Sequence, residues 1–84
     1  MRNGHRKPPK IYNDKNKNAF ILEFKVHDPE DEKSIEETVA SALNQIDEKQ
    51  YEANLIARGI PKEKIRKYGF AFEGKKVLIG EGKR

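Results

Sequence analysis

The chain is short, highly charged and free of cysteine. Of its 84 residues, 38% are charged and 35% hydrophobic, and its net charge is +4. This length holds one small domain with a small core. The lack of cysteine excludes a disulfide framework and a thiolate metal site. No apolar run has the length of a signal peptide or membrane span, so we expect a cytoplasmic protein without membrane contact.

Residues 1–18 are expected to form a basic, largely disordered arm. Lysine, asparagine and a Pro8-Pro9 pair dominate this segment. Only Ile11 and Tyr12 can anchor it, so we expect at most a short strand near Ile11. Two interpretations stay open, a tail that binds phosphate groups and a simple solvated terminus.

Residues 19–26 are expected to form a strand. Because side chains alternate along a strand, its even-numbered residues, all large and apolar, share one face. We expect that face to be core: Phe20, Leu22, Phe24 and Val26. The odd-numbered face starts with Ala19 and Ile21 and ends with Glu23 and Lys25. We therefore expect a strand covered on both sides, whose charged end opens into a cleft.

Glu23 and Lys25 are the candidate functional residues of this strand. Charges in a buried strand are costly unless they are paired or used. A carboxylate and an ammonium group on one face can hold a divalent metal and steady a phosphate. The alternative is an ordinary ion pair on a half-exposed strand.

A helix is expected after the strand. Asp28 can cap it with Pro29 in the first helical position, and Ser34 with Glu37 offers a second capping box. The acids at 28–32 suit the positive end of a helix dipole, and a metal cluster is the alternative. An apolar stripe then repeats at helical spacing, with Gln45 on its flank. It consists of Ile35, Val39, Ala42, Leu43 and Ile46.

A second short helix and a hairpin complete the chain. The short helix is expected at 51–58, ended by Gly59. Residues 66–79 alternate in polarity and predict a hairpin that turns at 73–74. Its Tyr68, Phe70 and Phe72 form a hydrophobic sheet face or a surface on which bases stack. A strand, a helix and another strand predict a crossover unit with parallel strands.

Several catalytic sites are excluded by their missing patterns. The sequence has no glycine-rich phosphate loop. His5 and His27 lack ligand-spaced partners, and neither Ser34 nor Ser41 is flanked by a glycine elbow. Nucleophilic catalysis and zinc binding are therefore not expected.

The order of elements resembles one family of nuclease domains. Residues 15–80 are similar to the C-terminal domain of a bacterial family in the PD-(D/E)XK nuclease superfamily, usually found behind an AAA-ATPase-like domain. The similarity is carried by the runs at 19–26, 42–51 and 68–76. It implies an α/β fold over residues 19–80: a small mixed β-sheet with one long and one short helix, a partial restriction-endonuclease-like core.

The resemblance also implies roles for individual residues. Glu23 corresponds to the ligand of a divalent ion, usually Mg²⁺. Lys25 corresponds to the catalytic lysine that stabilises charge on the phosphate or orients the attacking water. Gln45 corresponds to an auxiliary catalytic contact, and Lys49 and Tyr51 to contacts with nucleic acid. The implied reaction is phosphodiester hydrolysis, with DNA as the partner.

The sequence departs from the family pattern before residue 15. The family has a Gly-Arg-x-Asp run upstream of the Glu, and here Lys7 falls where the Asp is expected, followed by Pro8 and Pro9. Proline is a poor fit in a central strand. We therefore expect a truncated or frameshifted nuclease domain that binds Mg²⁺ weakly and is inactive alone. The alternatives are a nucleic-acid-binding module without catalysis and a homodimer formed through an exposed sheet edge.

Overall fold

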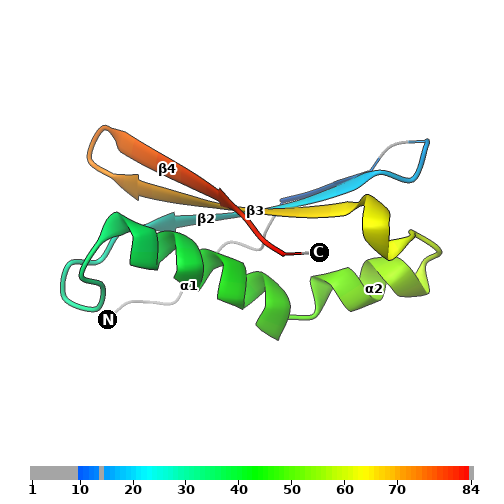
Figure 1. Cartoon of the computed structure of the whole chain (residues 1–84), viewed down its shortest axis with the longest axis horizontal. Coiled ribbons are helices and arrows are strands. Elements are labelled where there is room, and N and C mark those ends of the chain that lie inside the picture. Colours follow the sequence, from blue (N-terminus) through cyan, green and yellow to red (C-terminus); the bar gives the residue numbers. More distant parts are fainter. Residues whose placement is uncertain (1–9, 14, 84) are drawn as a thin grey trace.

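The structure is a computed structural model that describes residues 10–13 and 15–83. A four-stranded sheet lies against two α-helices (Figure 1). The strands are β1 (Lys10–Asn13), β2 (Ala19–Val26), β3 (Ile65–Glu73) and β4 (Lys76–Glu81). The helices are α1 (Ile35–Glu48), α2 (Tyr51–Ala57) and the 3₁₀ turn η1 (Lys62–Lys64). The predicted α/β class, with a small mixed sheet and one long and one short helix, is confirmed.

The strands lie in the order β1-β2-β3-β4, and only the central pair is parallel. This confirms the crossover unit, since α1 and α2 connect β2 to β3. Strand β1 confirms the short strand near Ile11 and lies inside the expected basic arm. The domain boundary at residue 18 stays a prediction, and residues 1–9, with the Lys7 position, lie outside the described part of the chain.

Of the two predicted N-caps of helix α1, the later one is the actual cap. Ser34 is the N-cap, and its Oγ accepts the backbone N–H of Glu37 at 3.3 Å. Asp28 does not cap a helix: its carboxylate accepts the N–H of Glu30, and its carbonyl accepts the N–H of Glu32. Ser34 is preferred because it directly precedes Ile35, the first residue of the apolar stripe.

Two glycines end elements with left-handed backbone. Gly59, at φ +97°, follows α2 at the predicted stop. Gly74, at φ +61°, lies in the hairpin turn. Because Glu73 pairs with Lys76, the turn residues are Gly74 and Lys75, one position later than predicted.

Among the described helices, none has the length and apolarity needed to cross a membrane.

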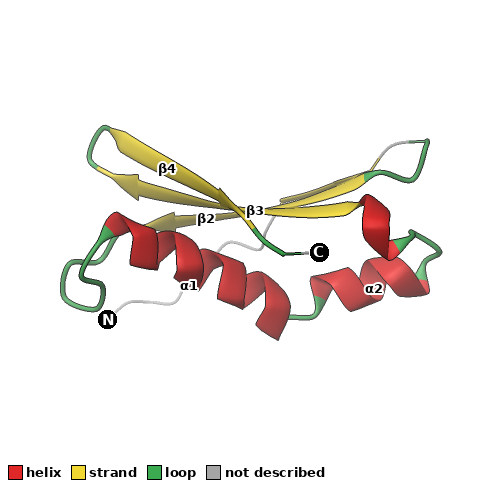
Figure 2. Ribbon diagram, in the orientation of Figure 1, coloured by secondary structure: helices red, strands yellow, loops and turns green. Residues whose placement is uncertain are grey.

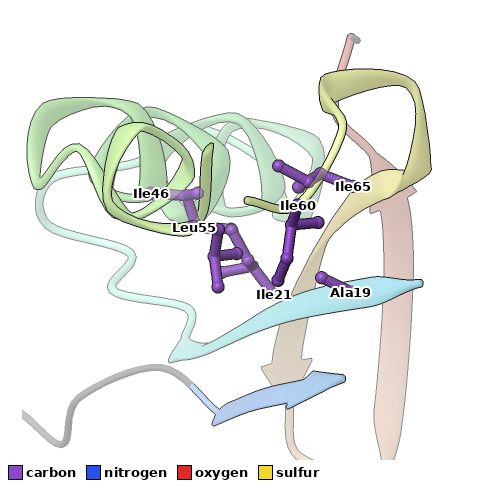
Figure 3. Packing of buried hydrophobic residues seen from close by; sticks show 6 residues of the cluster. All are labelled: Ala19, Ile21, Ile46, Leu55, Ile60 and Ile65. Atoms are coloured by element: carbon purple, nitrogen blue, oxygen red, sulfur yellow. The ribbon is translucent and has the colours of Figure 1, made fainter. Parts of the chain in front are cut away.

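The core lies between the helices and one face of the sheet. Figure 3 shows its side chains converging from β2, β3, α1, α2 and the loop before η1. They are small or aliphatic: Ala19, Ile21, Ile46, Leu55, Ile60 and Ile65. Partly buried Leu43 and Tyr51 pack against this cluster.

The predicted core face of β2 is wrong. The odd-numbered face of β2 packs against the helices, with Ala19 and Ile21 fully buried. On the even-numbered face, Phe24 is 45% exposed and Val26 72%. No described element covers that face, because α1 and α2 both lie on the other side (Figure 2).

Small residues explain why the helices pack on this face of the sheet. A Cβ atom placed on Gly69 would lie 3.1 Å from the Val39 carbonyl oxygen. One placed on Gly80 would lie 2.5 Å from Cγ1 of Val39. Glycine therefore allows α1 to approach β3 and β4 on this face, where larger side chains would hold it away.

Candidate functional site

Glu23 and Lys25 lie in the C-terminal half of β2, on the face beneath α1. Ligand sites of α/β folds commonly lie at the carboxyl ends of parallel strands. Glu23 pairs in register with Gly69, where α1 approaches the sheet closely, and is only 5% exposed. The Glu23 carboxylate therefore lies under a helix instead of in an open cleft.

The ammonium group of Lys25 is held by a second carboxylate. Lys25 Nζ lies 2.8 Å from Oε2 of Glu32, in the loop before α1. The other oxygen of Glu32 accepts the Asp28 N–H at 2.9 Å and the Thr38 hydroxyl at 2.7 Å. Both oxygens of this buried carboxylate are thus occupied, and Lys25 is fixed at the end of β2.

The environment of Glu32 favours its ionised form. Burial by itself would raise the pKa of Glu32. Hydrogen bonds from the Asp28 N–H, Lys25 and Thr38, together with the charge of Lys25, outweigh burial and lower the pKa to about 2. Glu32 is therefore an anion at neutral pH and a counter-charge for Lys25.

His27 extends the group to strand β3. Its Nδ1 lies 2.7 Å from Oγ1 of Thr38, and its Nε2 lies 3.7 Å from Oε2 of Glu73. The Thr38 hydroxyl has one proton, which it donates to Glu32, so we assign the donated proton of this second bond to His27 Nδ1. We call Lys25, His27, Glu32 and Thr38 the Glu32 cluster.

The Glu32 cluster was not predicted from the sequence. The sequence pattern groups Glu32 with several acids near a helix start and does not single out Thr38, yet Thr38 is fully buried. A usable signal was present, because Thr38 lies three residues after Ile35 and one before Val39, at the edge of the apolar stripe.

The other predicted site residues lie farther along α1. Gln45 is half-buried and directly precedes the core residue Ile46. Seven residues separate it from Thr38, which is about 10 Å of helix. Lys49 is the exposed C-cap of α1, and Tyr51 opens α2 and packs on the core. The roles of Gln45, Lys49 and Tyr51 stay predictions.

The described residues do not fit a divalent cation. Within residues 10–13 and 15–83, no group of three His, Asp or Glu side chains is arranged to hold a metal ion. The carboxylate of Glu32 is occupied by Lys25, whose positive charge opposes a cation nearby. A divalent ion usually needs several oxygen ligands, and Glu23 is the sole carboxylate that the predicted site offers one.

A second ionic group is centred on Lys67, a buried lysine of β3. The ammonium of Lys67, whose side chain is 8% exposed, lies 3.0 Å from Oε1 of Glu52 and 3.2 Å from Oδ1 of Asp47. Burial opposes its charge, but the bonds to Glu52 and Asp47 dominate and raise the pKa of Lys67. The second oxygen of Glu52 is buried without a hydrogen-bond partner among the described residues. The group connects β3 to both helices.

A comparison with protein families gives one match. The family model described as the PD-(D/E)XK nuclease superfamily matches residues 9–82. This span contains every described strand and helix, together with Glu23, Lys25 and Gln45. No curated protein and no solved structure matches the chain.

Proposed function

Because the chain belongs to the PD-(D/E)XK nuclease superfamily, we propose that it is a nuclease-like domain that does not hydrolyse phosphodiesters by itself. The observation that carries this proposal is the burial of Glu23 and the bonding of Lys25. Glu23 is 5% exposed beneath α1, and Lys25 is bonded to Glu32 at 2.8 Å. In this arrangement Glu23 is covered, and the ammonium group of Lys25 is engaged by a carboxylate of the same chain.

The proposal includes the finer features that the resemblance implies. DNA is the proposed substrate class of the ancestral site, Mg²⁺ its metal, and an AAA-ATPase-like domain its usual neighbour. The resemblance places the family Asp near position 7, where the sequence has lysine. A site with one carboxylate and an adjacent ammonium group stabilises Mg²⁺ poorly, so the lysine at this position supports a domain without catalysis.

The direct test is a cleavage assay on the purified full chain. Supercoiled plasmid and single-stranded DNA are incubated with Mg²⁺ or Mn²⁺, beside an equally purified Glu23→Gln variant. We expect the two proteins to give the same background. Metal-dependent cleavage by the wild type that disappears in Glu23→Gln would show a working active site and overturn the proposal.

A binding assay separates loss of catalysis from loss of DNA contact. Filter binding at rising salt reports contacts with phosphates, because affinity then falls steeply with salt concentration. Steep salt dependence with no cleavage would identify a nucleic-acid-binding module without catalysis, which is the alternative function given in the sequence analysis.

A further inference from the structure

The uncovered face of the sheet carries the largest hydrophobic side chains of the protein. The register places thirteen residues on this face, which we call the open face. All four phenylalanines of the chain are among them. The open face consists of Lys10, Tyr12, Phe20, Leu22, Phe24, Val26, Arg66, Tyr68, Phe70, Phe72, Val77, Ile79 and Glu81.

The open face is mainly apolar, and its aromatic rings lie in contact with one another. Phe24 and Phe70 lie in contact across β2 and β3, with ring centroids 4.9 Å apart. Val77 and Ile79 on β4 are 52% and 53% exposed. By contrast, the core beneath the helices holds no phenylalanine among the described residues. Contiguous exposed surfaces of this kind mark interaction sites.

The topology bears on the open face as well. Strands β2 and β3 form a parallel pair at the centre of the sheet, and sheets that are parallel throughout are covered on both faces. In Figure 1 both helices lie below the sheet, and no described element lies above it. The described elements therefore leave the open face uncovered.

We propose that a second copy of this chain packs on the open face, sheet against sheet. Strands about 4.8 Å apart with a rise of about 3.4 Å per residue give the face on the order of 400 Å² in projection. Its projecting side chains increase the accessible area toward the roughly 800 Å² per partner of a stable interface. A nearly flat sheet face is also self-complementary, as a two-fold interface requires.

The charges on the open face fit the same two-fold arrangement. Lys10 on β1 pairs with Leu22, Leu22 with Tyr68, and Tyr68 with Glu81 on β4. A cation and an anion thus lie at opposite edges of one row across the sheet. A two-fold axis parallel to the strands, between β2 and β3, brings Lys10 of each copy over the partner's Glu81. The same axis stacks Phe24 of one copy on the partner's Phe70.

Nucleic acid fits the open face less well. Phosphate binding needs available cations, and the described residues of this face include only Lys10 and Arg66. Arg66 lies 3.8 Å from Glu81 of the same chain. Aliphatic side chains also separate the aromatic ones, as Leu22 does between Phe20 and Phe24, which interrupts a stacking platform.

The proposal is tested by measuring mass in solution. Light scattering and sedimentation equilibrium of the full chain are expected to give twice the 9.7 kDa of one copy. Phe24→Lys or Val77→Lys, checked for wild-type circular dichroism, is expected to weaken association by roughly 100-fold or more, because it buries an unpaired charge. Ile56→Lys is the matched control, since Ile56 is 44% exposed on α2, away from the open face, and dimerisation should persist.

A charge exchange tests the orientation. Lys10→Glu and Glu81→Lys are each expected to weaken the dimer, and the double variant is expected to recover it. A wild type that is monomeric at high micromolar concentration would overturn the proposal. So would a dimer that persists in folded Phe24→Lys and Val77→Lys, since it would use another surface such as the sheet edge. A monomer that binds single-stranded DNA through Phe24 would instead make the open face a base-stacking surface.

Discussion

Glu32 defines the chemistry of the site more than the residues that the family pattern predicts. It is buried, and its carboxylate accepts hydrogen bonds from the ammonium group of Lys25 and the hydroxyl of Thr38. A lysine in such a pair is positioned by its partner and is not free to follow a reacting phosphate. At the level of single residues, Lys25 stabilises the end of β2 and the start of α1.

Replacing Glu32 by Gln is expected to change the response of the protein to acid. Glu32 has a pKa of about 2 in the folded state against 4.5 ordinarily, so its stabilisation is complete above pH 4.5 and is lost as the pH falls toward 2. In urea unfolding, Glu32→Gln should therefore be less stable than the wild type at neutral pH. Between pH 4.5 and 2 its free energy of unfolding should change less with pH than that of the wild type. Glu30→Gln, an exposed acid in the same loop, should keep the wild-type profile, and an unchanged profile in Glu32→Gln would contradict the assignment.

Lys67 gives a second prediction at this scale. Lys67→Met removes the cation between Asp47 and Glu52 and leaves their charges without a partner, so we expect a loss of about 2 kcal/mol or more. Lys75→Met, in the exposed hairpin turn, is the control and should change stability by less than about 0.5 kcal/mol. Equal stability of the two variants in urea unfolding would mean that the ion pairs of Lys67 contribute nothing net.

At the scale of elements, the approach of α1 to the sheet depends on Gly80. A methyl group there would lie 2.5 Å from Cγ1 of Val39, so Gly80→Ala is expected to cost about 1–3 kcal/mol. The Val39→Ala background removes the colliding atom, and the cost of Gly80→Ala should then largely vanish in a double-mutant cycle. Additive costs in the two backgrounds would show that α1 does not pack on Gly80.

The same elements show how far the sequence alone carries the structure. Periodicity and turn residues were enough for β2, both helices and the hairpin, because each has a strong local pattern. The choice of core face failed at Phe20 and Phe24, since both faces of β2 begin with apolar residues and hydrophobicity alone favours phenylalanine inside. Gly69 and Gly80 held the deciding information, because small residues on neighbouring strands set where a helix can lie.

The site was predicted less completely, for a related reason. The positions of Glu23 and Lys25 on one face followed from strand alternation. The partner of Lys25 comes from a loop seven residues away, whose backbone path no periodic pattern predicts. Glu32 was therefore assigned to the helix dipole.

At the scale of the whole molecule, the proposed dimer implies that stability depends on protein concentration. A partner that binds only the folded chain raises its stability by mass action. The Tm of the wild type is therefore expected to rise with protein concentration, whereas the Tm of Phe24→Lys should stay constant. Calorimetry over a wide concentration range checks this, and a Tm independent of concentration in the wild type would argue for a stable monomer.

In the proposed nuclease-like domain, Glu23 and Lys25 are held in a state that does not recruit metal. The most direct measurement is a titration of the full chain with Mg²⁺, followed by the backbone amide signals of Glu23, Lys25 and Glu32 in two-dimensional NMR. We expect only the small, non-saturating shifts that exposed acids such as Glu30 also show. Saturable shifts centred on Glu23 and absent in Glu23→Gln would contradict it.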